Sequence, residues 1–516
     1  PYYVRYTGND QVVDLAADLE AGGGMLAGTR ITSTFKLFEN ANDQLARVFL
    51  PDVSIFTEDP DNPLDASMFG DEGVQHGVDL IYRDRLGGDY TQGVGKASQV
   101  TSYLCLEERH LSDYVKNSTT TYRRYAGTVP NVYVPKEIES LEYLFYEEGL
   151  ANNTLRLALV DEEGAWTSMD SMFRGCRNLR LPSSFRLPRQ LENMDFGFYD
   201  CACVSVPEGM TLPSSLRSMQ WAFEECSLNS LPQGFALNEG VQDVTGAFSR
   251  SHVVSLPDGF RVPSSVTNMN YLFQDCVSLK EVPPALLTDV TATTMYDVFA
   301  GCRSLVLPEG FRLPDQATTM SSMFSKCTSL VTLPESLVLP SKVEDIGWMF
   351  ASCTSLKSLP SGFLVPDSVV KADSLFSGCS RLESLPSFSF GNSVETIPNA
   401  FRGCTHLSAE LDIPISVTDM DGCFLNAGSL ASAVFDEEGN RVASGTGGKY
   451  AIVARYHDPG SRLGVVNYAQ SHGNANLLMT TSYDWSNWEK VYGDSAAPYS
   501  DEHGAFYLHY VGAAHE

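Results

Sequence analysis

The segment MSSMFSKC at residues 320–327 places two methionines, a phenylalanine and a cysteine within eight positions. Thioether and thiolate sulfurs are soft ligands that favour copper, and a cysteine can also be a nucleophile or a redox switch. A blue-copper centre needs histidine ligands as well, however. Within residues 131–430 only His252 and His406 occur, far apart in the sequence, so the segment does not predict a copper site.

Carboxylates gather in TEDPDNPLDASMFGDEG, residues 57–73. Oxygen ligands at short spacing are what calcium prefers, but the ligand order of an EF-hand is absent. Calcium at this acidic loop is therefore one interpretation, and a solvated loop without a metal is the other.

Five of the nine histidines fall in the last sixty residues: His457, His472, His503, His509 and His515. His503 and His509 are six residues apart, which on one strand places them on the same face but about 20 Å from each other. This spacing does not favour zinc. An enzyme in this part of the chain would need a cleft containing His472, His503 or Cys423 together with convergent polar groups.

Other catalytic signatures are missing from the sequence. EAGGGMLAGTR, residues 20–30, lacks the Lys-Ser/Thr ending of a phosphate-binding loop, and no nucleophile-elbow, HExxH or Walker pattern occurs. We therefore predict that the protein is not an enzyme and that it has no catalytic, cofactor-binding or metal-binding residues.

The methionine and cysteine of the opening segment recur through an internal repeat of 25 or 26 residues, marked by a phenylalanine in each copy. The marks are Phe173, Phe198, Phe223, Phe248, Phe273, Phe299, Phe324, Phe350, Phe376 and Phe401. A Cys follows each mark by three residues, except at Ser251; a Met or another apolar residue precedes it by four; a Leu usually follows it by six. Weaker copies end at Phe145 and Phe424, as capping repeats do, which gives about twelve units.

A period of 25 is too short for paired-helix repeats, which need more than about 30 residues. It predicts a solenoid whose coils contain a short strand, a tight helical turn and an extended return, with strands paired in parallel about 4.8 Å apart. The Phe, Cys, Met and Leu marks would then form internal ladders. Stacked cysteines would hold their Cβ atoms about 5 Å apart, beyond the usual disulfide range of about 3.5–4.5 Å. We expect them to be small core residues, with some disulfide pairing or a metal as the less favoured alternatives.

Three segments carry a family resemblance: NMNYLFQDCVSLKEVP, TMSSMFSKCTSLVTLP and WMFASCTSLKSLP. They resemble the BspA-like leucine-rich repeats, in the variant with a 25-residue period, and the resemblance covers roughly residues 134–430. It implies a surface-exposed, non-enzymatic protein used for adhesion to proteins or cells. This sequence departs from the family pattern by placing Leu-Pro pairs in the return segment of each repeat.

The flanks do not repeat. QVVDLAADLE at 11–20 predicts a helix, whereas ARVFLPDVSIF and HGVDLIYRDR predict strands. Near the other end KYAIVARYHD, SRLGVVNYA and GAFYLHYVG are strand-like, and DEEG, at 161–164 and again at 436–439, is typical of a hairpin turn. The predicted fold is a leucine-rich-repeat-like solenoid at 131–430, flanked by an N-terminal α+β domain at 1–130 and a small C-terminal β-rich domain at 431–516.

Composition limits the partners. The formal net charge of −29 argues against nucleic acid and against docking on anionic lipid. No stretch of about 20 apolar residues is present, so we expect no direct membrane insertion. The chain begins PYYVRYTG without an initiator Met, and we expect that a preceding segment was removed.

Function should lie where the repeat varies. Two residues before the mark the side chain ranges from Gly to Trp, and five before it the residue is nearly always polar. The predicted partner-binding residues are Phe196, Trp221, Tyr271, Trp348, Asn193, Asn268, Thr319 and Asp345. The sequence favours an extracellular, cell-surface binding or adhesion protein with a protein or glycan partner. The alternative is a structural subunit of a surface layer, filament or virus or phage particle that contacts copies of itself. The aromatics could also cover gaps between coils.

Overall fold

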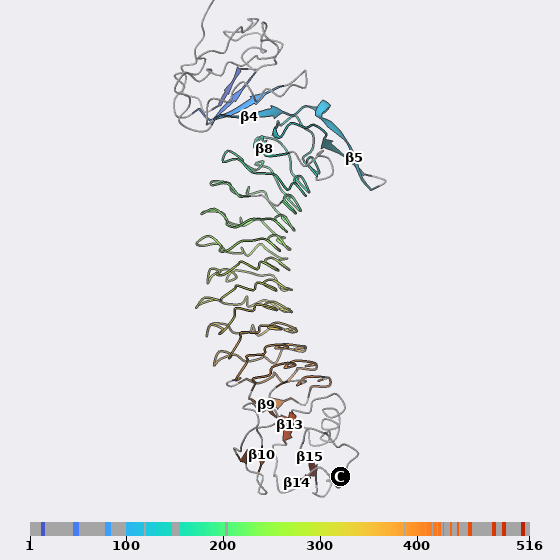
Figure 1. The fold of residues 1–516 in the computed structure, drawn as a ribbon, viewed down its shortest axis with the longest axis vertical. Coiled ribbons are helices and arrows are strands. Elements are labelled where there is room, and N and C mark those ends of the chain that lie inside the picture. Colours follow the sequence, from blue (N-terminus) through green and yellow to red (C-terminus); the bar gives the residue numbers. More distant parts are fainter. Residues whose placement is uncertain are drawn as a thin grey trace, which may run out of the picture. The chain divides into compact units, whose positions relative to one another are not determined.

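Short parallel strands and hydrogen-bonded turns build the chain, which divides into two compact units, residues 1–215 and 216–516 (Figure 1). The computed structural model describes residues 12–15, 45–50, 78–83, 100–117, 120–146, 155–201, 205–385, 388–407, 409–414, 416–420, 422–424, 427, 434–435, 441–442, 452–456, 477–480, 488–491 and 507–510. The predicted domain boundaries at 130 and 430 stay predictions.

Unit 1 holds a six-stranded sheet whose strands pair in parallel in the order in which they occur along the chain. They are β1 (Val12–Asp14), β2 (Arg47–Phe49), β3 (Val78–Tyr82), β4 (Val100–Cys105), β7 (Asn131–Val134) and β8 (Leu157–Val160). Leu80 pairs with Val48 on one side and Ser102 on the other, and every residue of β3 is buried. A strand that is buried along its whole length is typical of a parallel sheet covered on both faces.

The N-terminal helix prediction is wrong for Val12–Asp14; Leu15 is helical, and the rest of QVVDLAADLE lies outside the described residues. Val12–Asp14 of the segment QVVDLAADLE form strand β1, because their amides and carbonyls pair with β2. Tertiary pairing thus overrides the local helical pattern. The two predicted strands in this region are present as β2 and β3, and helix is nearly absent from the described residues.

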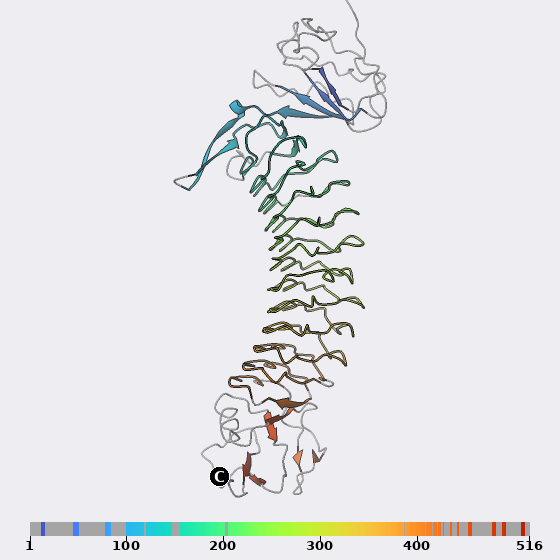
Figure 2. The same cartoon turned by 180° about the vertical axis from the view of Figure 1, so that it is seen from behind.

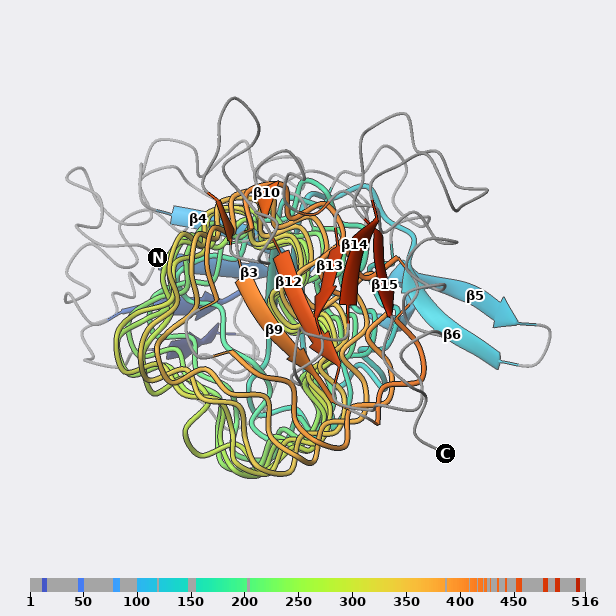
Figure 3. The same cartoon turned by 90° about the horizontal axis from the view of Figure 1, so that it is seen from below.

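A hairpin leaves the parallel sheet between β4 and β7. It consists of β5 (Leu111–Asn117) and β6 (Thr120–Tyr125), paired antiparallel and preceded by the short 3-10 helix η3 (Glu108–His110). Figures 2 and 3 show the hairpin as an arm extending away from the sheet of unit 1. Tyr114 faces Tyr122 across it, so both rings share one face.

The predicted ladders are confirmed in the core of the repeats. In unit 2, seen from below in Figure 3, successive coils lie over one another. Stacked rings join neighbouring marks, as with Phe299 and Phe324, whose centroids are 5.6 Å apart with planes at 2°. Met320, Phe324, Cys327 and the equivalent residues of other coils are fully buried. The sulfur-rich segment is therefore one layer of a packed core.

The predicted helical turn is instead a run of hydrogen-bonded turns. Alternate amides before and after each mark donate to the next coil: Val244, Gly246, Phe248 and Arg250 reach carbonyls 2.7–3.0 Å away. The amides between them donate within the coil, as Ala247 does to Val244 at 3.1 Å. Gly246 and Arg250 have φ of 57° and 54°, a left-handed conformation that no α-helix contains. Because half the amides leave the coil, a helix cannot form.

The Leu-Pro pairs open turns in the return segment. In Pro257–Phe260 the amide of Phe260 donates to the carbonyl of Pro257 at 3.0 Å, and Gly259 lies between them with φ of 74°. Glycine at this turn position is the type II signature. Phe260 then packs edge-on against Phe248, with ring centroids 6.5 Å apart. The sequence did not reveal this second ring, which other coils also contain, as at Phe311 and Phe363.

Beyond the last full coils, β9 (Ala409–Ile413), β12 (Ile452–Tyr456) and β13 (Leu477–Thr480) form a parallel sheet in the order β13-β12-β9. Two antiparallel pairs join β10 (Val434–Phe435) to β11 (Arg441–Val442) and β14 (Trp488–Val491) to β15 (Tyr507–Tyr510). The strands predicted in KYAIVARYHD and GAFYLHYVG are β12 and β15; SRLGVVNYA lies outside the described residues. The DEEG at 436–439 separates the strands of a hairpin, whereas that at 161–164 follows the parallel strand β8.

Candidate functional site

The residue two before each mark, here called the variable position, has the same backbone in every coil. Its φ is 52° at Phe196, 54° at Trp221, 62° at Tyr271 and 58° at Trp348. Its amide donates to the next coil, as Trp348 does to the carbonyl of Asp373 at 2.7 Å. The hydrogen bonds hold this left-handed backbone whatever the side chain, so side chains can vary here without loss of the fold.

Trp221 and Tyr271 occupy the variable position in coils separated by the coil of Gly246. Their rings stack with centroids 5.8 Å apart and planes at 27°. A Cβ on Gly246 would lie only 2.0 Å from the Trp221 ring, so the glycine leaves the space through which the indole reaches Tyr271. Both rings are half-buried, and they form one continuous aromatic surface on unit 2.

Trp348 is the most exposed ring at this position. Its neighbours at the variable position are Ser322 and Ser374, which are too small to cover an indole, and 52% of Trp348 is exposed. Tryptophan is enriched among the residues that dominate binding interfaces, so this exposed indole is a candidate contact residue. Trp221, Tyr271 and Trp348, all in unit 2, are here called the aromatic row.

The four polar predicted residues form the parallel bridges between coils. Asn193 bridges to Ser168, Asn268 to Asp243, and Thr319 to both Thr294 and Asp345. Asn193 Oδ1 accepts from the Asp195 amide at 2.7 Å, and Asp345 Oδ1 accepts from the Gly347 amide at 2.9 Å. Asn268 Nδ2 donates to Asp243 Oδ2 at 3.2 Å. All four are half-buried. Three of these side chains thus bond within the array, and contact of any of the four with a partner stays a prediction.

Phe196 lies in unit 1, in a different setting. The Arg174 guanidinium stands 5.3 Å from its ring centroid and 4.6 Å from that of Tyr199. Arg174 also stands over the ring of a further tyrosine in the same unit, Tyr146. The sequence did not reveal these ring contacts, since Tyr146, Arg174 and Phe196 come from three different coils.

The ladder cysteines are free, buried thiols in the described part of the chain. Each thiol from Cys276 to Cys404 donates to the carbonyl of the marking phenylalanine one coil earlier, as Cys327 Sγ does to Phe299 O at 3.1 Å. Burial raises the pKa of Cys353 and of Cys404 to about 12. These thiols remain protonated at neutral pH, which suits a hydrogen-bond donor and not a metal ligand or a nucleophile.

Cys105 and Cys423, which lie off the ladder, are also buried free thiols. Burial raises the pKa of Cys105 to about 12. Within the described ranges no three His, Cys, Asp or Glu side chains cluster as metal ligands do. The calcium candidate at 57–73 lies outside the described residues, as do His457, His472, His503 and His515, while His509 belongs to β15.

Unit 1 also contains a buried carboxylate that the sequence did not reveal. Asp79 on β3 lies 4.0 Å from the Arg47 guanidinium of β2. Burial raises the pKa of this carboxyl, opposed by a hydrogen bond from Ser184 and by the charge of Arg47. Ion pairs inside a sheet perturb pKa values without any catalytic role, and Arg47 and Asp79 face each other across the ladder.

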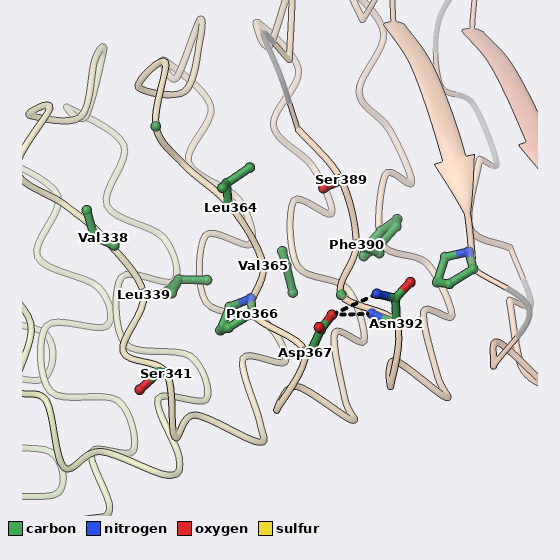
Figure 4. Close-up of a pocket in the computed structure, with 13 residues that line it drawn as sticks. Val338, Leu339, Ser341, Leu364, Val365, Pro366, Asp367, Ser389, Phe390 and Asn392 are labelled. Carbon is green, nitrogen blue, oxygen red and sulfur yellow. Dashed lines mark hydrogen bonds between the residues drawn. The ribbon is translucent and has the colours of Figure 1, made fainter.

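A groove of about 530 Å³ crosses the return segments near the end of the repeats (Figure 4). Val338 and Leu364 line it at the same repeat position in adjacent coils, and more than half of each side chain is exposed. Asp367 accepts hydrogen bonds from both the amide and the side chain of Asn392 at its floor. The lining is mainly apolar, and it presents no nucleophile next to a base.

Comparisons with known proteins agree with the repeat geometry. Residues 322–445 match the BspA type leucine rich repeat region, with six copies. Residues 217–332 and 242–363 match a family described as Mycoplasma protein of unknown function, DUF285. Comparison with curated proteins and with solved structures finds no match. None of the helices in the described residues has the length and apolar character needed to cross a membrane. The match confirms the resemblance to BspA-type leucine-rich repeats over residues 322–445, where the buried Phe and Cys ladders continue.

Proposed function

We propose that the protein is a non-enzymatic binding protein, displayed outside the cell, which contacts a protein or glycan partner through the aromatic row. The supporting observation is Trp348: an indole held 52% exposed on a backbone fixed by hydrogen bonds to the next coil. Aromatic side chains on a rigid support lose little entropy on binding and often dominate interface energies.

The rest of the array supports this role by its rigidity. The Phe, Cys and Met ladders are buried and hydrogen-bonded, so their residues are occupied by packing. The side chains free to differ between coils are those at the variable position, where a partner could be recognised without any change in the core. The groove at Val338 and Leu364 offers apolar surface on the same unit.

The test is a double variant, Trp221→Ala with Trp348→Ala, compared with the wild-type chain on arrays of purified glycans and extracellular proteins. We expect at least tenfold weaker binding with an unchanged far-UV spectrum. Val277→Ala is the control, because Val277 is also an exposed apolar side chain of unit 2, at 41%, but lies at another repeat position. Equal binding by the wild type and the folded double variant would exclude the aromatic row as the contact surface.

A second candidate is self-assembly into a layer, filament or particle. Val254, Val306 and Val331 are exposed on the return ladder, where Val306 donates to the Lys280 carbonyl at 2.9 Å. Exposed valines on a regular ladder could form the contact between copies, and Lys280 and Lys357 interrupt the column. Sedimentation of the purified chain separates the two functions: a monomer across the micromolar range favours the binding protein, and concentration-dependent polymers favour assembly.

A further inference from the structure

An aromatic and arginine cluster covers one face of the hairpin β5–β6 and the coils beside it in unit 1. The face of the hairpin that carries Tyr114 and Tyr122 also carries Arg124. Tyr122 packs on Tyr143 with centroids 4.5 Å apart, and Tyr114 packs on Tyr146 at 5.3 Å. The cluster comprises Tyr114, Tyr122, Arg124, Tyr143, Tyr146 and Arg174, here called the tyrosine cluster.

Two guanidinium groups lie over tyrosine rings of this cluster. Arg124 stands 4.9 Å from the ring centroid of Tyr114, and Arg174 stands 5.9 Å from that of Tyr146. A guanidinium stacked on an aromatic face keeps its N–H edge in the plane, directed away from the ring. The stacking therefore orients both groups before any ligand arrives.

Neither guanidinium has a carboxylate partner in the part of the chain that the structure describes, and Arg124 Nε is buried without a hydrogen-bond acceptor. The adjacent Arg123, on the opposite face of the hairpin, behaves differently. It pairs with Asp113 at 2.8 Å and Glu108 at 3.4 Å. In a chain of net charge −29, two half-buried arginines that pair with no carboxylate among the described residues are a local exception.

The chemistry of the cluster indicates the ligand. Sugar rings bind to open aromatic faces, but here the faces of Tyr114, Tyr146 and Tyr122 already contact other rings or guanidinium groups. The guanidinium N–H groups of Arg124 and Arg174 are the hydrogen-bond donors that such a cluster offers at its edges. Carboxylates pair with guanidinium in the bidentate geometry that these donors provide.

We propose that the tyrosine cluster is a docking site for an acidic protein segment, whose Asp or Glu side chains pair with Arg124 and Arg174. This site lies in unit 1 and is separate from the aromatic row of unit 2. Repulsion from the acidic chain as a whole is screened beyond about 8 Å at physiological salt, so local pairing determines binding.

The experiment titrates the full chain with a fluorescein-labelled decapeptide of alternating glutamate and serine at 0.1 M salt, followed by fluorescence anisotropy. We expect saturable binding that weakens about fivefold or more in Arg124→Gln and in Arg174→Gln, and more than tenfold in the double variant. Arg174→Lys keeps the charge but not the planar fork, and should also bind more weakly. Thermal unfolding verifies that each variant is folded.

Arg177→Gln is the matched control, because Arg177 is exposed in the same unit and pairs with Asp200 at 2.9 Å; its affinity should stay within twofold of the wild type. The Trp221→Ala and Trp348→Ala variant should bind the peptide normally, which separates this site from the proposed function. The proposal would be overturned if the peptide showed no saturable binding, or if Arg177→Gln and Arg174→Gln lost affinity equally. It would also be overturned if the chain captured polygalacturonate but not the peptide.

Discussion

The indole of Trp221 stacks on the phenol ring of Tyr271 across an intervening coil, with centroids 5.8 Å apart. The contact exists because Gly246 occupies the variable position between them. Two rings that are far apart in the sequence thereby become one rigid surface. The pair also shows how a repeat array can hold a specific feature: three coils differ at one position, while the ladders beneath them stay the same.

Gly246→Ala should disrupt this pair. A Cβ would lie 2.0 Å from the Trp221 ring, so the indole must move off Tyr271. We expect a loss of about 2–4 kcal/mol in the free energy of unfolding, from overpacking added to left-handed backbone strain. Urea unfolding measures the loss, and near-UV circular dichroism reports the ring pair.

Gly259→Ala is its control, since Gly259 also has positive φ but no atom within 4 Å of an added Cβ. The strain alone should cost about 1–2 kcal/mol. If Gly246→Ala and Gly259→Ala lowered the free energy of unfolding equally, the Trp221 ring would not fill the space above Gly246.

Substitution of Cys327 distinguishes a hydrogen-bonding thiol from a simple apolar filler. Cys327 Sγ donates to Phe299 O at 3.1 Å, and Ser251 stands at the equivalent site of another coil. We expect Cys327→Ser to lose about 1 kcal/mol and Cys327→Ala about 1–2 kcal/mol, because serine keeps a donor for the carbonyl. Urea unfolding measures the free energy of unfolding of both variants. If serine were clearly worse than alanine, the thiol would be acting as a hydrophobe only.

The raised thiol pKa values predict sensitivity to alkali. Burial raises the pKa of Cys353 and of Cys404 to about 12, from 9.0 when unperturbed. Above about pH 9 the unfolded chain releases these protons while the folded chain keeps them. The free energy of unfolding should therefore be constant below about pH 8.5 and should fall between pH 9 and 12, by up to about 1.4 kcal/mol per pH unit for each thiol.

Urea unfolding at intervals from pH 7 to 10.5 measures this dependence. Cys353→Ala should lower the slope above pH 9 by about the contribution of one thiol, whereas Gly259→Ala should shift the curve without changing its slope. A slope that is the same in the wild type and in Cys353→Ala would contradict the buried, protonated thiol.

The ladders could be predicted from sequence because each coil repeats the same packing problem. Phe324, Cys327 and Met320 recur at fixed offsets, and a stack places equal offsets above one another. The prediction of a helical turn was wrong because periodicity does not reveal which amides donate hydrogen bonds to the next coil. The left-handed residue of each coil directs its amide to the next coil. It is Trp221 in one coil and Gly246 in the next, so no residue type identifies this position in the sequence.

The candidate surfaces were predictable only in part. Variation among the repeats identified Trp221, Tyr271 and Trp348 as a set, but not the stacking, which depends on the glycine between two of them. Asn193 and Asp345 fit a surface pattern equally well, yet their side chains hold backbone amides. The tyrosine cluster left no signal, since the hairpin β5–β6 and the coils contribute to it from separate parts of the sequence.

The central claim is that the aromatic row binds the partner while the ladders only support it. The most direct measurement compares the dissociation constants of the wild type, of Trp221→Ala with Trp348→Ala, and of Val277→Ala for one glycan or protein captured on the arrays. We expect at least tenfold weaker binding for the folded tryptophan variant and less than twofold change for Val277→Ala. Equal affinity of all three chains would contradict it.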